Sequence, residues 1–234
     1  MEKLILIPAR YGSTRFPGKP LAKINGKEMI LHVCEGCAKT GYDMYVVTDD
    51  SRIVDVVTKA GFTCVVIKGD YMTGSDRVAG AAKIFDHDII INVQGDEPLV
   101  DYRDIINVAD KCVALVDSPV NLCKSTCDVL ENQNTIKVVT KNNGQLLYMS
   151  RSKIPFKSIT TRKQVGIYAY PRNVLAYCFG KGRVKSHLEL NEDVEILRFI
   201  DFGEKVFVIE TKNKYQAVDT PEDIKKVEDI LNGV

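Results

Sequence analysis

The chain gathers glycines and cationic side chains directly after its first apolar run. The segment at residues 7–20 reads Ile-Pro-Ala-Arg-Tyr-Gly-Ser-Thr-Arg-Phe-Pro-Gly-Lys-Pro and contributes Arg10, Arg15 and Lys19. Backbone N–H groups and cations in one loop can bind a polyphosphate. The spacing is not that of a Walker A loop, because five residues separate Gly12 from Gly18 and a proline follows the lysine. The segment predicts a different kind of polyphosphate site, with an ordinary solvated surface loop as the alternative.

Two acidic segments elsewhere in the chain are candidates for holding a divalent cation. Asp96 lies in Asn-Val-Gln-Gly-Asp-Glu-Pro at residues 92–98, directly after the most hydrophobic run. A carboxylate at the end of a buried strand can ligate Mg2+ on a nucleotide phosphate, although a capped turn with solvated carboxylates is the alternative. Asp219 precedes Thr220 and Pro221, so it either caps a helix or reaches toward Asp96 as a second metal ligand.

The elements that position these residues alternate in type along the first part of the chain. Continuous apolar runs such as Ile-Ile-Ile-Asn-Val are typical of central parallel strands, and amphipathic stretches between them indicate helical crossovers. An α/β fold with a mostly parallel central sheet wrapped by helices follows, and ligands of such sheets bind at the carboxyl ends of the strands. The expected strands cover residues 4–8, 44–48, 63–67 and 89–93, and the expected helices cover 27–39, 51–60 and 76–85.

The later part of the chain changes character. Asn142-Asn143-Gly144 predicts a hairpin, because Asn and Gly tolerate positive φ. We therefore expect a single domain over residues 1–234 with a smaller, inserted antiparallel subdomain at about 135–210. The expected strands are 136–140, 145–150, 165–170 and 206–210, and the expected helices are 171–179, 192–202 and one that begins at Thr220.

Composition excludes several classes of protein. The 234 residues are 45% hydrophobic and carry 32 Lys and Arg against 31 Asp and Glu, so a broad basic face for nucleic acid or an anionic membrane is not expected. No apolar run approaches the ~20 residues of a membrane helix, and a cytosolic protein is expected. The pairs Cys34/Cys37 and Cys123/Cys127 raise a zinc site as an alternative, but helical spacing places the first pair on a buried face.

Taken together, the motifs resemble the 3-deoxy-manno-octulosonate (Kdo) cytidylyltransferases, or CMP-Kdo synthetases. The resemblance implies a Rossmann-like nucleotidyltransferase that uses Mg2+ and CTP to transfer CMP to the anomeric hydroxyl of a 2-keto sugar acid for a surface glycan, with release of pyrophosphate. It also implies a homodimer, and it implies that the subdomain at about 135–210 serves acceptor binding or dimerisation. The resemblance runs from Ile5 to about Ile230 and is carried by residues 7–10, 13–15, 17–20, 73–77, 92–98, 148–155 and 218–223.

The resemblance also implies roles for individual residues. Arg10, Arg15 and Lys19 would hold the triphosphate, with Lys19 neutralising the leaving group. Asp96 and Asp219 would hold Mg2+. The cytosine base of CTP would be contacted by Ala9, Gly74 and Ser75. Arg77 and Gln94 would lie near the nucleotide and the sugar. The acceptor would be contacted by Arg151, Tyr168 and Glu195.

Two positions in the implied acceptor pocket depart from the family pattern. The chain has Gln164 where the family motif His-x-Gly-Ile-Tyr begins, and Ile196 where Leu-Glu-Gln-Leu-Arg has its glutamine. If position 196 contacts the sugar, the loss of an amide disfavours an acceptor that needs it, and restoring glutamine should improve activity toward Kdo. Alternatively, water or a neighbour compensates and the acceptor is still Kdo. The acceptor could instead be an amino-substituted Kdo, a nonulosonic acid or another acid, and the chain could instead be a catalytically silent nucleotide-binding regulator.

Overall fold

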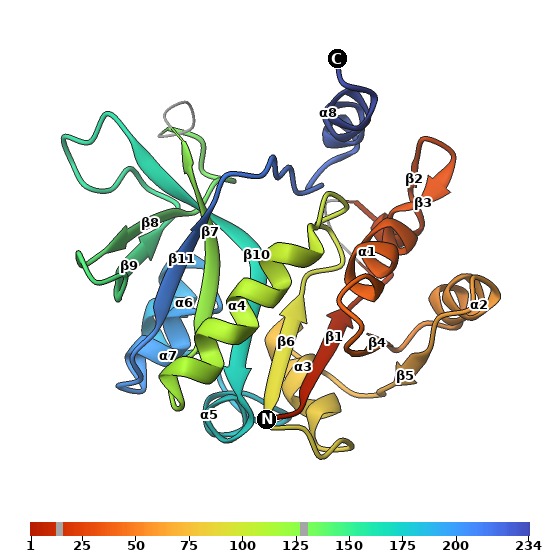
Figure 1. The fold of residues 1–234 in the computed structure, drawn as a ribbon, viewed down its shortest axis with the longest axis horizontal. Helices are drawn as coiled ribbons and strands as arrows, with labels where there is room; N and C mark the ends of the chain where they lie inside the picture. Colours follow the sequence, from red (N-terminus) through yellow and green to blue (C-terminus); the bar gives the residue numbers. More distant parts are fainter. Residues whose placement is uncertain (13–15, 127–130) are drawn as a thin grey trace.

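The computed structural model describes residues 1–12, 16–126 and 131–234, and within them the chain folds around one large mixed β-sheet (Figure 1). The sheet order is β11-β7-β10-β6-β1-β4-β5, with the β8–β9 hairpin attached to β10. The four strands β6, β1, β4 and β5 are parallel to one another, while β10 pairs antiparallel with both β6 and β7. The expected α/β fold with a mostly parallel sheet is confirmed, with one antiparallel strand at its centre.

The strands follow the apolar runs, and the helices lie between them. The strands are β1 (Lys3–Pro8), β2 (Lys23–Ile24), β3 (Lys27–Glu28), β4 (Asp43–Thr48), β5 (Cys64–Val66), β6 (Ile89–Val93), β7 (Val120–Thr126), β8 (Lys137–Thr140), β9 (Leu146–Ser150), β10 (Thr161–Pro171) and β11 (Phe207–Thr211). The helices are the 3-10 helix η1 (Lys19–Leu21) and α1 (Met29–Ala38), α2 (Ser51–Lys59), α3 (Gly74–Ala82), α4 (Tyr102–Leu115), α5 (Arg172–Cys178), α6 (His187–Glu192), α7 (Leu197–Asp201) and α8 (Pro221–Asn232).

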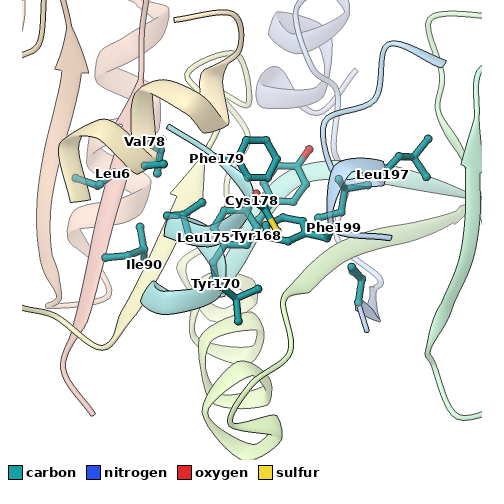
Figure 2. Close-up of a cluster of buried hydrophobic side chains, with 14 of the residues drawn as sticks. Leu6, Val78, Ile90, Tyr168, Tyr170, Leu175, Cys178, Phe179, Leu197 and Phe199 are labelled. Atoms are coloured by element: carbon teal, nitrogen blue, oxygen red, sulfur yellow. The ribbon is translucent and has the colours of Figure 1, made fainter. Parts of the chain in front are cut away.

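The alternation of side chains along each strand builds a hydrophobic core on both faces of the sheet. In β1, Leu4 and Leu6 pack on the face covered by α3, α5 and α7, whereas Ile5 and Ile7 pack on the face covered by α1, α2 and α4. Figure 2 shows the first of these clusters, in which aromatic side chains of β10 and α7 meet the residues of α3 and α5. Burial on both faces explains why these runs are continuously apolar.

From the sequence, the apolar faces of residues 174–179 and 194–202 could pack internally or form a dimer contact; in the structure they pack internally. Val174, Leu175, Leu197 and Phe199 are each at most 6% exposed within the first core cluster. The expected helix over residues 192–202 is wrong, because α6 ends at Glu192 and Asp193 adopts a left-handed conformation with φ of 49°. A second short helix, α7, then begins at Leu197.

The cysteines act as small apolar groups. Cys34 and Cys37 lie on the buried face of α1, as the helical spacing predicted, and are both 0% exposed. Burial raises the pKa of the Cys34 thiol to about 12. Of the second pair, Cys123 is buried in β7, and Cys127 lies outside the described residues. Among the residues that the structure describes, no helix is both long and apolar enough to cross a bilayer.

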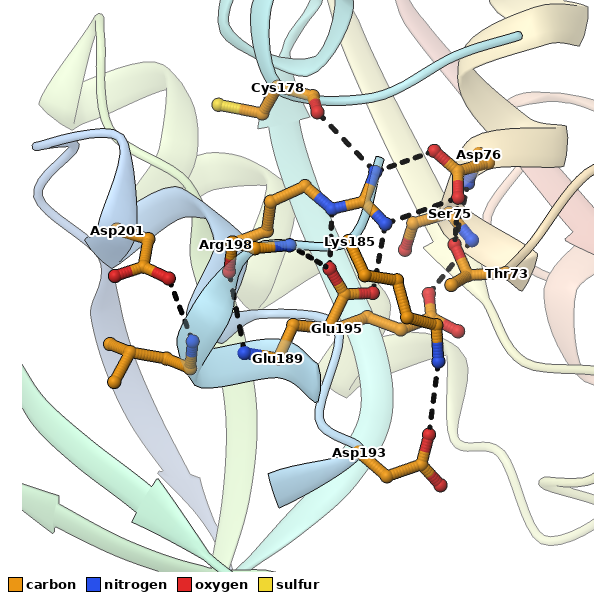
Figure 3. A network of polar contacts seen from close by, with 12 residues as sticks. Thr73, Ser75, Asp76, Cys178, Lys185, Glu189, Asp193, Glu195, Arg198 and Asp201 are labelled. Carbon is orange, nitrogen blue, oxygen red and sulfur yellow. Dashed lines mark hydrogen bonds and ion pairs between the residues drawn. The ribbon is translucent and has the colours of Figure 1, made fainter. Parts of the chain in front are cut away.

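A buried ion network joins α3 to α6 and α7 (Figure 3). Arg198 is 0% exposed and donates two hydrogen bonds to Asp76, at 2.7 and 3.2 Å, and two to Glu189, at 2.6 and 2.9 Å. The guanidinium also lies 4.1 Å from the ring centroid of Phe179. Since a buried charge is tolerated only when it is paired and hydrogen-bonded, all three members depend on one another.

We expect Arg198→Met to lower the free energy of unfolding by about 3–5 kcal/mol, because it leaves the carboxylates of Asp76 and Glu189 buried without their partner. Urea unfolding measures the change. Arg172→Met is the matched control, since Arg172 pairs with the fully exposed Asp86 and its loss should cost less than about 1 kcal/mol. Equal losses in the two variants would contradict a structural role for the network.

Candidate active site

A cavity of about 700 Å³ opens at the carboxyl ends of β1 and β6. Its walls come from segments that are far apart in the sequence: the loop after β1, the first turn of α3, the turn after β6, the middle of β10 and the segment before α8. This is the edge at which the sequence placed the ligand. The predicted residues that line the cavity are Ala9, Arg10, Lys19, Gly74, Arg77, Gln94, Asp96, Arg151, Gln164, Tyr168, Glu195 and Asp219.

Lys19 joins the loop after β1 to both acidic segments. Its ammonium Nζ lies 2.6 Å from Oδ2 of Asp96 and donates to the carbonyl of Val218 at 2.9 Å. The N–H of Val218 in turn donates to the carbonyl of Asp96 at 3.0 Å, so the segment before α8 is bound to the turn after β6. A cation and a carboxylate therefore meet inside the cavity, and the backbone of Val218, the residue before Asp219, is hydrogen-bonded to Lys19 and to the main-chain carbonyl of Asp96.

Asp96 and Asp219 form a donor set that suits Mg2+. Both line the cavity, and the pKa of the neighbouring Glu97 is raised by burial first and then by the negative charges of Asp96 and Asp219. Mg2+ prefers hard oxygen ligands and binds through one or two carboxylates together with substrate phosphates. The residues that the structure describes contain no group of three or more His, Cys, Asp or Glu side chains placed to hold a metal. Asp96 and Asp219, both at the cavity wall, could hold Mg2+ together with phosphate oxygens of a bound nucleotide.

The turn that carries Asp96 is fixed against the bulge of β10. Gln94 donates its N–H to the carbonyl of Gly166 at 2.8 Å, and Gly166 donates its own N–H to Oε1 of Glu97 at 2.8 Å. A Cβ on Gly166 would lie 3.0 Å from side-chain atoms of Gln94, so glycine is the residue that permits this approach without a shift. Glu97 is 5% exposed, and burial, with the Asp96 charge, raises its pKa to about 7.

Glu195 binds the first turn of α3. Its carboxylate accepts the N–H of Gly74 at 3.2 Å and the N–H of Ser75 at 2.8 Å (Figure 3 labels Glu195 and Ser75). A helix N-terminus stabilises a carboxylate in this way. Desolvation raises the pKa of Glu195, and these hydrogen bonds oppose the rise. The backbone N–H groups of Gly74 and Ser75 are therefore already bound within the chain.

Ser75 differs from its predicted position. The sequence placed it beside the base, but it is 1% exposed and does not line the cavity. Its hydroxyl accepts a hydrogen bond from Asn92 at 3.4 Å. The physical reason is that Ser75 occupies the second position of α3 and faces β6, whereas Gly74, one residue earlier, lies at the cavity wall.

Arg77 lines the cavity and is held in place by other parts of the protein. It is 7% exposed, donates to Asp49 at 2.7 Å and to the carbonyl of Ile67 at 3.1 Å, and lies 5.4 Å from the ring centroid of Tyr71. Asp49, which follows β4, was not identified from the sequence. Its position at a strand end was the available signal.

The acceptor residues predicted on β10 and near β9 lie along one wall. Tyr168 is 9% exposed and stacks on Tyr170, and desolvation raises its pKa. Gln164 lies on the other side of the β10 bulge. Arg151 donates through Nε, Nη1 and Nη2 to the carbonyls of Glu192, Gln133 and Asp193, each at 3.1 Å. Its guanidinium therefore holds backbone segments together as well as facing the cavity.

Ile196 is not part of the cavity wall, which corrects the expectation that it contacts the acceptor. It is 1% exposed, lies in the core cluster with Leu197 and Phe199, and directly precedes α7. Adjacent residues at a helix start point in different directions, so Glu195 faces the cavity while Ile196 faces the core. Arg15, the remaining predicted phosphate ligand, lies outside the described residues.

The sequence did not identify Lys185, Asp193, Gln133 or Asn134, which also line the cavity. These residues precede or follow short helices and strands, and no apolar pattern or motif marked them as neighbours of β10.

Comparison with known proteins agrees with this geometry. Residues 4–224 match the family described as cytidylyltransferase. The 3-deoxy-manno-octulosonate cytidylyltransferase of Trichlorobacter lovleyi is 39% identical over 98% of both chains, and the 8-amino-3,8-dideoxy-manno-octulosonate cytidylyltransferase of Shewanella pealeana is 40% identical over 96% of both.

Solved structures extend the comparison to the fold. A CMP:2-keto-3-deoxy-manno-octonic acid synthetase complexed with CTP superposes with a TM-score of 0.90 at 34% identity, covering 100% of this chain and 99% of the other. The HddC protein of Yersinia pseudotuberculosis, at 15% identity and a TM-score of 0.73, shares the fold over 99% of this chain and 100% of its own. The chain is an enzyme that belongs to the cytidylyltransferase family, in the group that includes the 3-deoxy-manno-octulosonate and 8-amino-3,8-dideoxy-manno-octulosonate cytidylyltransferases.

Proposed function

We propose that this cytidylyltransferase transfers CMP from CTP to the anomeric hydroxyl of a Kdo-type 2-keto sugar acid and releases pyrophosphate. The proposal rests on one observation: in a cavity at the edge of the sheet, Lys19 forms an ion pair with Asp96 and a hydrogen bond to the carbonyl of Val218, the residue before Asp219. The names of the relatives and the CTP complex of the similar solved structure support the same reaction. The homodimer and the surface-glycan product remain predictions.

The reaction requires positioning and charge neutralisation more than covalent chemistry. The α-phosphorus is attacked in line by the acceptor oxygen while negative charge grows on the departing pyrophosphate. Arg10 and Lys19 line the cavity at the loop after β1, where they would bind the triphosphate. Lys19, already held by Asp96 and by the Val218 carbonyl, would neutralise the leaving group without a large rearrangement.

Asp96 and Asp219 would hold Mg2+ together with phosphate oxygens of CTP. Mg2+ bound there would supply positive charge to the α-phosphate and lower the pKa of the acceptor hydroxyl. The contribution of the chain is to fix the two carboxylates relative to each other. It does so through the backbone hydrogen bond between Val218 and Asp96 and through the attachment of the Asp96 turn to Gly166.

The acceptor would lie against β10, between the Asp96 turn and Arg151. Tyr168, Gln164 and Glu195 face this part of the cavity. With Ile196 in the core, Gln164 is the departure from the family motif that lies at the wall. A glutamine can both donate and accept a hydrogen bond, as a histidine can, which supports an acceptor of the same chemical class as Kdo.

The test is pyrophosphate release from CTP and Mg2+ with Kdo, its 8-amino analogue and a nonulosonic acid offered in turn. We expect release with at least one of the first two acids and loss of release when EDTA removes the metal. Release with none of the three acids would contradict the proposal and favour a silent nucleotide-binding protein.

We expect Asp96→Asn to lower kcat at least about 100-fold, because it removes negative charge from the metal site and from the contact with Lys19. The fold should persist, since the side chain keeps its volume and is 29% exposed. Pyrophosphate release and the thermal midpoint measure the two effects. A collapse of thermal stability with little loss of kcat would show that Asp96 is structural instead.

We expect Ile196→Gln to lower the free energy of unfolding by about 1–3 kcal/mol and to leave the KM for Kdo unimproved, because the amide would be buried in the core. Urea unfolding and steady-state kinetics well below the melting temperature check both parts. Ile196→Leu, which keeps the apolar volume, is the control. A lower KM for Kdo in Ile196→Gln would restore this position to the sugar pocket.

A further inference from the structure

Lys185 places a cation on the acceptor side of the cavity. It follows α5 and precedes α6, and its side chain is 24% exposed. The ammonium Nζ lies 3.2 Å from Oδ1 of Asp193, which is its hydrogen-bonded partner in the part of the chain that the structure describes. An ammonium has three donors, so this single contact leaves donors available to a ligand in the cavity.

Asp193 lies between Lys185 and Arg151 (Figure 3 shows its contact with Lys185). One carboxylate oxygen contacts Lys185 and the other lies 3.4 Å from Nη2 of Arg151. The side chain is 71% exposed, and the backbone has φ and ψ of 49°, a conformation that few residues other than Gly, Asn and Asp adopt readily. The chain thus places an exposed carboxylate beside two cations of the cavity.

Lys185 and Arg151 differ in how firmly the protein holds them. Three nitrogens of Arg151 donate to backbone carbonyls, so its guanidinium is part of the wall. Lys185 is held by Asp193, through an exposed ion pair of the kind that contributes little to stability. Lys185 can therefore exchange Asp193 for another anion at little cost to the fold.

We propose that Lys185 is a specificity-determining residue that binds the carboxylate of the sugar acid, and that the Asp193 carboxylate competes with the sugar acid for it. This inference rests on the proposed function, because it assigns part of the same acceptor site. A charge-assisted hydrogen bond from Lys185 favours an acid over a neutral sugar. Arg151 adds positive charge beside it without leaving its backbone partners.

The test compares the steady-state kinetics of Lys185→Met, Lys185→Arg and Asp193→Asn with those of the wild-type chain. We expect Lys185→Met to raise the KM for Kdo about tenfold or more, because a charge-assisted hydrogen bond is lost, and to leave the KM for CTP within about twofold. Lys185→Arg should retain most of the affinity. Asp193→Asn, which tolerates the same backbone conformation, should lower the KM for Kdo.

Lys181→Met is the matched control, because Lys181 lies exposed in the same loop, near Gly69, and does not line the cavity.

Two kinetic results would overturn the proposal: a KM for Kdo that is unchanged in Lys185→Met, or a KM for Kdo that does not fall in Asp193→Asn. Kdo and its 8-amino analogue share the carboxylate and differ at position 8. A Lys185→Met effect confined to one of the two acids would place Lys185 at the other end of the sugar and also overturn it.

Calorimetric titration with Kdo keeps this test separate from that of the proposed function. If wild-type enzyme releases no pyrophosphate with Kdo, the proposed transfer to Kdo fails, but the subsite is still judged by binding. Weaker Kdo binding in Lys185→Met than in Lys181→Met would support the subsite. Equal binding in the two variants, or no binding to the wild-type chain, would overturn it.

Discussion

The ion pair between Lys19 and Asp96 is the contact on which the arrangement of the site depends. It joins the loop after β1 to the turn after β6, and the bond from Lys19 to the Val218 carbonyl brings in the segment before α8. These segments are separated by most of the chain, so a parallel sheet with aligned strand ends is needed to bring them together. The same contact keeps a cation and a carboxylate close together at the cavity wall.

The wall of the cavity that carries Glu195 is positioned by a second set of contacts, the buried Arg198 network. Arg198 fixes Asp76 of α3 and Glu189 of α6, and Glu195 binds the first turn of α3 from the segment between α6 and α7. This wall is consequently attached to α3, whose first residue, Gly74, also lines the cavity. Rigid attachment of this kind is what a transfer reaction needs, because the attacking oxygen and the phosphorus must be held in line.

The sequence predicted the parts of this protein that arise from local pattern. Continuous apolar runs located the central strands, and the strand-end rule located Lys19, Asp96 and the cavity edge. The pattern did not predict α4 or β7, and it joined residues 192–202 into one helix that the left-handed Asp193 interrupts. Nor did it indicate that Arg198 is fully buried, because a charged residue in a helix is usually solvated and its two carboxylate partners lie on other elements.

Glu195 and Ile196 show why a motif match does not carry over to each of its residues. Both belong to the same short motif, but the chain is about to enter α7, and successive side chains there diverge by roughly 100° around the helix axis. One carboxylate reaches the first turn of α3 beside the cavity, while its neighbour packs against Leu197 and Phe199. An isoleucine at position 196 therefore fits the core of this protein and leaves the polar lining of the cavity, which includes Gln164 and Glu195, unchanged.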